Sequence, residues 1–352
     1  MCESTAIKPT KYFVAANSYN GFVSLFDKHF DSRDFDRIYV LKGGPGTGKS
    51  SFMKKASSLF NDRNCIVDEI YCSSDPHSLD GVIAKKNNKR IAIIDGTAPH
   101  ERDAVIPGAI DEIINLGNGW DSKWLVAKKS KILEINYEKS SAYKCGYSYL
   151  KMAGTADRYV YDSYSSIFRK NEAKNKADEL LSDITTSPEQ KSKCLFISSF
   201  GRYGSYKISE NDCNLGRIVR VRGDDFASTL FINTIRDAAI SRGLTFIDLK
   251  SPLEPSNSDG IRFEGANVCF LKSDVGEINS NEFLENDKMY SERTRRAKEI
   301  KKTALEEAER WFSVASELHF RLEEIYGSAM DFHKNTEMLD EKLGEMQNIL
   351  EI

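Results

Sequence analysis

A glycine-rich segment in the first fifty residues has the residue types and spacing that bind phosphate. The run Gly43-Gly-Pro-Gly-Thr-Gly-Lys-Ser50 fits the pattern Gly-x-x-x-x-Gly-Lys-Ser/Thr of a P-loop, with an apolar segment before it and a helical pattern after it. Glycines let successive backbone N–H groups point at one anion, and the following helix adds the positive end of its dipole. Lys49 supplies a mobile charge for the β- and γ-phosphates. The predicted phosphate-binding set is Gly44, Pro45, Gly46, Thr47, Gly48, Lys49, Ser50 and Ser51.

A second motif supplies the metal side of the same site. Arg90-Ile-Ala-Ile-Ile-Asp95 has four apolar residues followed by a carboxylate, which is the form of a Walker B strand. A carboxylate at the C-terminal end of a parallel strand can hold Mg²⁺ beside the Ser50 hydroxyl. Ser50 and Asp95 are therefore the predicted metal ligands, with ATP and Mg²⁺ as the cofactors. An Asp-Gly turn at the end of a buried strand is the alternative.

The group that would activate the attacking water is less evident from the sequence. Gly96 and Thr97 follow Asp95, so the usual place for an activating carboxylate is empty. His100, just past this strand, is the predicted γ-phosphate sensor or base, and an exposed loop histidine is the alternative. Lys49, Asp95 and His100 are thus the predicted catalytic residues, and slow turnover is expected. Other candidates are Glu69, Asp75, His77, Glu101 and Asp80, the last of which is expected in a structural turn.

The elements around these motifs alternate between strand and helix, which indicates an α/β fold with mainly parallel sheets. Strand patterns are expected at 11–16, 37–42, 65–71 and 90–95, and a helical pattern at 51–60. Pro107 precedes an apolar pattern at 108–115 that predicts a short amphipathic helix. The chain then divides into a P-loop core at 1–120, a helical segment at 121–186, a second core at 187–284 and a C-terminal helical segment at 285–352.

The second core repeats the order of the first, so we expect a duplicated P-loop domain. Gly21 corresponds to Gly204, 183 positions later, and the strand ending at Ile94 corresponds to the one ending at Leu271, 177 positions later. The phosphate-handling positions are lost in the repeat, where Lys49, Ser50 and Asp95 align with Thr229, Leu230 and Lys272. The sequence therefore predicts one active and one degenerate nucleotide site.

Composition excludes several other classes of protein. The 352 residues are 40% hydrophobic and 29% charged with a net charge of −3, so a fully disordered chain is excluded and a non-specific nucleic-acid binder is disfavoured. No apolar run is long enough to span a membrane, and no signal-peptide pattern begins the chain. The seven scattered cysteines are typical of reduced thiols, so a cytoplasmic location is expected. A basic run at 293–302 and seven tyrosines at 137–164 are expected to be a solvated helix face and packing residues, with nucleic-acid contact as the alternative.

The P-loop, Cys72-Ser-Ser-Asp-Pro-His-Ser-Leu-Asp-Gly81, Ile94-Asp-Gly-Thr-Ala-Pro-His100 and Pro107–Leu116 together resemble a family of uncharacterised bacterial ATPases that have tandem P-loop domains with helical insertions. The resemblance implies ATP binding and a duplicated P-loop fold. We therefore expect a slow Mg²⁺-dependent ATPase whose helical segments contact a protein partner and are separate from the nucleotide core. A small-molecule or nucleotide kinase, and a nucleotide-gated scaffold without significant turnover, are the alternatives.

Overall fold

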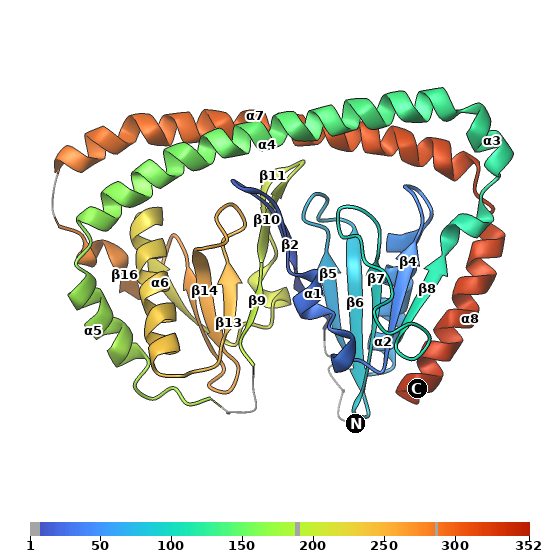
Figure 1. The fold of residues 1–352 in the computed structure, drawn as a ribbon. Coiled ribbons are helices and arrows are strands. Elements are labelled where there is room, and N and C mark those ends of the chain that lie inside the picture. The colour runs from blue at the N-terminus through green and yellow to red at the C-terminus, as the bar shows by residue number, and fades with distance from the viewer. Residues whose placement is uncertain (1–7, 187–190, 286–287) are drawn as a thin grey trace.

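The protein consists of two α/β domains beneath a pair of long helices, seen in a computed structural model that describes residues 8–186, 191–285 and 288–352 (Figure 1). The six strands of the first sheet lie in the order β1 (Thr10–Tyr12), β5 (Ile66–Tyr71), β6 (Leu79–Lys86), β7 (Lys89–Asp95), β4 (Arg37–Lys42) and β8 (Asp111–Asn115). β6 is antiparallel to both neighbours, and the other five strands run in one direction. The expected α/β class is confirmed, and the sheet is mixed.

The second sheet has the same order of corresponding strands. These are β9 (Lys193–Leu195), β13 (Ile247–Lys250), β14 (Ser258–Phe263), β15 (Val268–Lys272), β12 (Arg217–Arg222) and β16 (Ile278–Asn279). Here β14 is the strand that runs against the others. The identical topology supports the repeat that the sequence indicates.

Two small hairpins join the domains at the centre of the molecule. They are β2 (Ala15–Ser18) with β3 (Gly21–Ser24), and β10 (Ser198–Gly201) with β11 (Gly204–Lys207). Just before them, the backbone N–H and C=O groups of Phe13 and Phe196 pair at 2.8 and 2.9 Å. Because Phe13 and Phe196 are corresponding positions 183 residues apart, the two domains are related by an approximate two-fold axis at this pairing.

Helices connect the domains in an exchanged arrangement. α4 (Lys129–Ser166) runs from the first domain to the second, and α7 (Lys288–Ser328) runs back against it, so that the pair spans the top of both domains in Figure 1. α5 (Lys170–Leu180), which follows the first half, packs against α6 (Asp225–Ser241) of the second domain. α8 (Phe332–Leu350), which follows the second half, packs against the first domain. The shorter helices are α1 (Phe26–His29), α2 (Lys49–Asp62), α3 (Ser122–Ala127), η1 (Ser32–Asp34), η2 (Leu116–Gly119), η3 (Glu210–Asp212) and η4 (Ser280–Phe283).

The C-terminal helix completes the core of the first domain. Leu339, Leu343, Met346 and Leu350 of α8 are between 0 and 8% exposed and pack in the cluster that contains the inner face of α2. The expectation that residues 285–352 are separate from the nucleotide core is therefore wrong for α8.

Three other sequence expectations have clear outcomes. The segment predicted as a helix at 108–115 forms β8, an edge strand paired with β4, in which Ile114 is buried while Ile113 is 47% exposed. Tyr143 and Tyr147 of α4 pack as expected, because they contact the ring of Phe312, whereas Tyr137 and Tyr159 are 79% and 50% exposed. No helix in the described part of the chain is long and apolar enough to cross a bilayer.

Candidate functional site

The glycine-rich segment lies between β4 and α2, with its backbone shaped for close approach of an anion. Gly46 and Gly48 have φ angles of +69° and +88°, a left-handed conformation that favours glycine. Gly48 is the N-cap of α2 and provides no side-chain cap, and the Thr47 hydroxyl instead donates to the Gly44 carbonyl at 2.9 Å. The first N–H groups of α2 therefore have no capping side chain and can donate to a ligand.

The structure brings the lysine of one motif to the carboxylate of the other. Lys49 Nζ donates to the carbonyls of Gly43 and Gly44, both at 3.0 Å, and lies 3.7 Å from Asp95 Oδ2. Asp95 ends β7 directly beside Leu41 of the parallel strand β4. Burial raises the pKa of Asp95, and the Lys49 charge opposes that rise. The Lys49 ammonium is held by two backbone carbonyls, which are weak acceptors. It could therefore move from them to the oxygens of a bound phosphate.

Ser50 and Asp95 retain oxygen atoms suited to a divalent cation. Ser50 Oγ accepts a hydrogen bond from the Leu79 N–H at 3.0 Å. Asp95 Oδ1 accepts from the N–H and the hydroxyl of Thr97 at 2.9 and 2.6 Å. The other carboxylate oxygen, Asp95 Oδ2, is the one that faces Lys49. Within the described residues, no group of three or more His, Cys, Asp or Glu side chains could hold a metal ion. One hydroxyl and one carboxylate fit Mg²⁺, which takes most of its ligands from phosphates and water.

His100 is buried, so the alternative of an exposed loop histidine is wrong. Its Nε2 lies 3.0 Å from Asp80 Oδ2, and its ring stacks on Phe26 with the centroids 4.2 Å apart. Asp80 belongs to β6, and the structural turn expected there is also wrong. Burial raises the pKa of Asp95 most, the Lys49 charge lowers it, and the charge of Asp80 raises it further. His100 is thus linked to the metal side of the site through Asp80.

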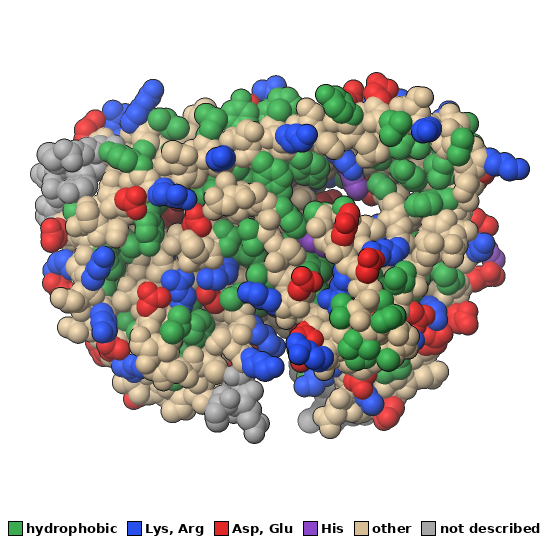
Figure 2. Space-filling model, viewed as in Figure 1, with side chains coloured by type: hydrophobic (Ala, Val, Ile, Leu, Met, Phe, Trp, Pro, Cys, Tyr) green, Lys and Arg blue, Asp and Glu red, His purple; other side chains and the backbone are tan. Residues whose placement is uncertain are grey.

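Helix α7 supplies residues above the loop that no motif in the sequence indicated. A Cβ placed on Gly46 would lie 2.7 Å from the backbone oxygen of Glu323, and Gly44 is flanked by Trp120 and Tyr326. Burial raises the pKa of Glu323, and a hydrogen bond from the backbone of Gly46 opposes that rise. Figure 2 shows a hollow between the helix pair and the first domain, with acidic and basic side chains at its margin.

His319 lies one turn before Glu323 and faces the same space. Its Nε2 is 3.6 Å from Glu323 Oε1. Burial lowers the pKa of His319 to about 4, with further lowering by the charges of Lys139 and Lys49. His319 is therefore a neutral imidazole at pH 7 beside the candidate phosphate site.

Two of the remaining acidic candidates from the sequence, Glu69 and Asp75, accept hydrogen bonds within the first domain. Glu69 accepts from the hydroxyls of Ser57 and Tyr71 at 2.6 and 2.9 Å. Asp75 accepts from the His77 N–H at 3.2 Å, while Glu101 is exposed. Of these, Asp75 lies close to α7, because its Oδ2 is 3.7 Å from Arg202 Nη1 and the Arg202 guanidinium lies 4.6 Å from the ring of Phe320.

In the second domain, the place that corresponds to the glycine-rich segment and Asp95 is occupied by a network of charged side chains. Lys272 Nζ lies 2.7 Å from Asp225 Oδ1 and 3.3 Å from Asp259 Oδ1, and it donates to Thr229 Oγ1 at 3.0 Å. Burial alone would lower the pKa of Lys272, and the two carboxylates outweigh it and raise the pKa. A lysine thus stands where a metal-binding carboxylate would be needed, and carboxylates stand near the place of the phosphates.

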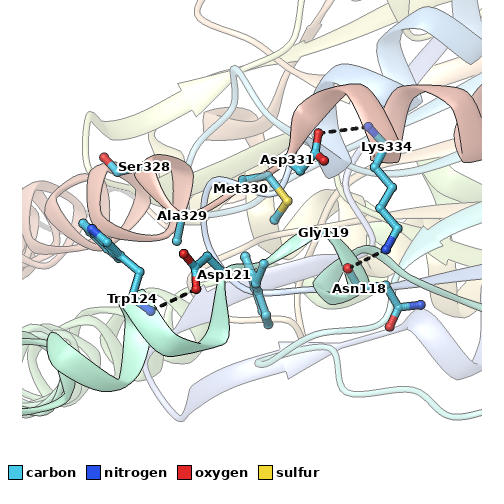
Figure 3. A pocket seen from close by; sticks show the side chains of 10 residues that line it. Asn118, Gly119, Asp121, Trp124, Ser328, Ala329, Met330, Asp331 and Lys334 are labelled. Atoms are coloured by element: carbon cyan, nitrogen blue, oxygen red, sulfur yellow. Dashed lines mark hydrogen bonds between the residues drawn. The ribbon is translucent and has the colours of Figure 1, made fainter.

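A cavity of about 440 Å³ lies beside the loop, where α3 meets the turn between α7 and α8 (Figure 3). Asp121 caps α3 by accepting from the Trp124 N–H at 3.1 Å, and Lys334 donates to the Asn118 carbonyl at 3.3 Å. Trp120 lines this cavity and also packs on Gly44, so its side chain lies between the cavity and the glycine-rich segment.

Comparison of the chain with protein-family models, with curated proteins and with solved structures finds no match.

Proposed function

We propose that this protein binds one Mg²⁺·ATP at Gly43–Ser50 and hydrolyses it slowly, while the second domain carries a degenerate site. The observation that carries this proposal is the 3.7 Å approach of Lys49 to Asp95 across adjacent parallel strands. Lys49 and Asp95 belong to motifs 46 positions apart in the sequence, and their proximity supports one shared site. Ligands of α/β sheets bind at this carboxyl edge.

Each group then has a defined task. The backbone N–H groups of the loop and of the first turn of α2 would bind the β- and γ-phosphates, and Lys49 would leave the Gly43 and Gly44 carbonyls for phosphate oxygens. Ser50 and Asp95 would hold Mg²⁺, which neutralises charge on the phosphates. Turnover is expected to be slow because Gly96 and Thr97 follow Asp95, and the carboxylates nearest the loop come from elsewhere in the fold.

Calorimetric titration with Mg²⁺·ATP tests this proposal. Lys49→Ala should weaken binding about 10-fold or more, because a charged hydrogen bond to phosphate contributes about 1.5–3 kcal/mol. The matched control is Lys55→Ala on the same helix, whose ion pair with Asp340 is half exposed and should not matter for ATP. Wild-type protein that does not bind Mg²⁺·ATP, or Lys49→Ala protein that binds as tightly as wild type, would contradict the proposal.

A nucleotide-gated scaffold is a second candidate that one contact favours. The Glu323 carboxylate lies at the Gly46 backbone, where a phosphate would also bind, so ATP would compete with α7 for the loop. Hydrogen exchange of the α7 amides measures this competition. ATP should increase exchange around Glu323 in a gated protein, and unchanged exchange with ATP bound would argue against gating.

A further inference from the structure

A hairpin of the second domain reaches into the first domain beside the phosphate loop. The strands β10 and β11 end at the paired residues Gly201 and Gly204, so Arg202 and Tyr203 form the tip. A Cβ on Gly201 would lie 2.8 Å from the Ser74 carbonyl, and Asn17 donates to the Phe200 carbonyl at 2.8 Å. The tip is therefore fixed against residues 72–78 of the first domain by close backbone packing.

Residues 72–78 in turn lie against the start of α2. The N–H of Leu79 donates to Ser50 Oγ at 3.0 Å, and Lys54 Nζ donates to the His77 carbonyl at 2.7 Å. The ring of Tyr203 packs edge-on against the His77 ring, with centroids 5.6 Å apart. The hairpin tip is thus separated from the candidate metal ligand Ser50 by one short loop.

The Arg202 side chain is partly exposed, and its Nε–H donor has no partner. Its side chain is 18% exposed, its Nη1 lies 3.7 Å from Asp75 Oδ2, and its Nε has no hydrogen-bond partner in the structure. The guanidinium is held between the rings of Tyr203 and Phe320, at 4.7 and 4.6 Å from their centroids. Buried donors are nearly always satisfied, and a guanidinium with free donors matches the oxygens of a phosphate.

The space that Arg202 faces is the one above the phosphate loop. Phe320, which stacks on Arg202, lies on α7 between His319 and Glu323. Glu323 lies about one helical turn after Phe320, and its backbone oxygen would lie 2.7 Å from a Cβ placed on Gly46 of the loop. Arg202 and Lys49 therefore approach one acidic space from opposite domains.

The other half of the molecule provides an internal comparison. Its hairpin tip, between the paired residues Ser18 and Gly21, has Tyr19 at the position of Arg202. Tyr19 is buried beside the degenerate site, where its N–H donates to the Leu253 carbonyl at 2.9 Å. The arginine is thus present only at the site whose loop keeps lysine and serine, although both hairpins have the same architecture.

We propose that Arg202 is a catalytic residue that the second domain supplies to the site of the first, where it contacts the γ-phosphate of ATP. The inference rests on the proposed ATPase function. In the reaction, a water oxygen bonds to the γ-phosphorus while the bond to the β–γ bridging oxygen breaks, with its electron pair leaving on ADP. The water proton passes to the released phosphate or to solvent, and Arg202 stays protonated and stabilises the charge on the transferring group. The degenerate domain is retained, in this view, because it carries that arginine.

The test measures ATP affinity by calorimetry and single-turnover release of phosphate from γ-labelled ATP. Arg202→Ala should bind ATP within a few-fold of wild type and lose about 100-fold or more in rate. Arg202→Lys keeps the charge and the length and should fold normally, with a rate between the two. Lys207→Ala is the matched control, since it removes a positive charge from the same hairpin, where Lys207 pairs with Glu210, and should leave the rate within a few-fold of wild type.

Different failures have different meanings in this experiment. Equal rates for wild type and Arg202→Ala would overturn the role of Arg202 alone. The same is true if Lys207→Ala reproduces the full loss, because the loss would then follow from any change in the hairpin. Wild-type protein that binds ATP and releases no phosphate would overturn both the role of Arg202 and the proposed hydrolysis, and would leave the binding of ATP. Wild-type protein that fails to bind ATP would overturn the proposed function together with this inference.

Discussion

Replacing Met346 of α8 by alanine should destabilise the first domain, although this residue lies more than 230 positions after the last strand of that domain. Met346 is fully buried in the cluster under the first sheet, so Met346→Ala should cost about 2–5 kcal/mol. Four buried side chains of α8 together contribute about 6–12 kcal/mol of transfer free energy, which is comparable to the whole stability of a domain, about 5–15 kcal/mol. A chain ending at Met330 should therefore lose the folded first domain and its ATP site.

Hydrogen exchange resolved by strand is the assay, since it reports the two sheets separately. Met346→Ala should reduce protection in β4 and β7 more than in β12 and β15. The matched control is Phe332→Ala at the start of the same helix, where the side chain is 50% exposed and little change is expected. Unchanged protection of β4 and β7, or a loss confined to the second sheet, would refute the role of α8 in the first core.

Four further outcomes are expected. Calorimetry should give one ATP per chain, with Thr229→Ala unchanged in affinity, and a stoichiometry near two would show that the second site works. Steady-state turnover without a partner should stay below about 10 s⁻¹, the median for enzymes, and a faster measured rate would contradict the missing activating carboxylate. Lys272→Ala should lower the free energy of unfolding by about 1–3 kcal/mol in a denaturant titration, because the mostly buried Asp259 loses its partner, and an unchanged midpoint would exclude this. Burial lowers the pKa of His29 to about 4 in the folded protein, whereas its value in the unfolded chain is near 6.5. The fold therefore favours the neutral imidazole, and up to about 3 kcal/mol of the free energy of unfolding should be lost as the pH falls from 6.5 to 4. His29→Gln should flatten this dependence of stability on pH.

The parts of the fold that depend on local sequence were predictable. The strand at 37–42 has the predicted bounds, and a glycine-rich turn and a helix follow it, because a strand, a glycine turn and a helix start are each encoded by neighbouring residues. The prediction of a helix at 108–115 is wrong, and it arose because Ile110, Ile113 and Ile114 fit helical spacing. In the structure the backbone from Asp111 to Asn115 pairs with the edge of β4, and this long-range pairing makes the segment a strand.

The residues that complete the site were not predictable by the same means. Glu323 packs on Gly46 and Arg202 lies beside Asp75, from positions 277 and 156 residues after Gly46, and neither belongs to a motif. The apolar spacing of 285–352 correctly indicated helices, but amphipathic spacing does not specify which surface a helix covers. The internal repeat is the one signal in the sequence that could indicate Arg202. When the two hairpins are aligned, Arg202 corresponds to Tyr19, so the hairpin of the second half has a positive charge where the other has a tyrosine.

The exchange of α5 and α8 between domains has a consequence for synthesis on the ribosome. The last strand of the first sheet ends at Asn115, but the helix that covers this sheet ends at Leu350. At about 5–20 residues per second, the ribosome needs roughly 10–50 s to make the intervening chain. During that interval the apolar face that α8 will cover is exposed. The second domain has no such interval, because α5 is synthesised before the strands of the second sheet. The nascent first domain is therefore the part of the protein that most needs protection from aggregation before release.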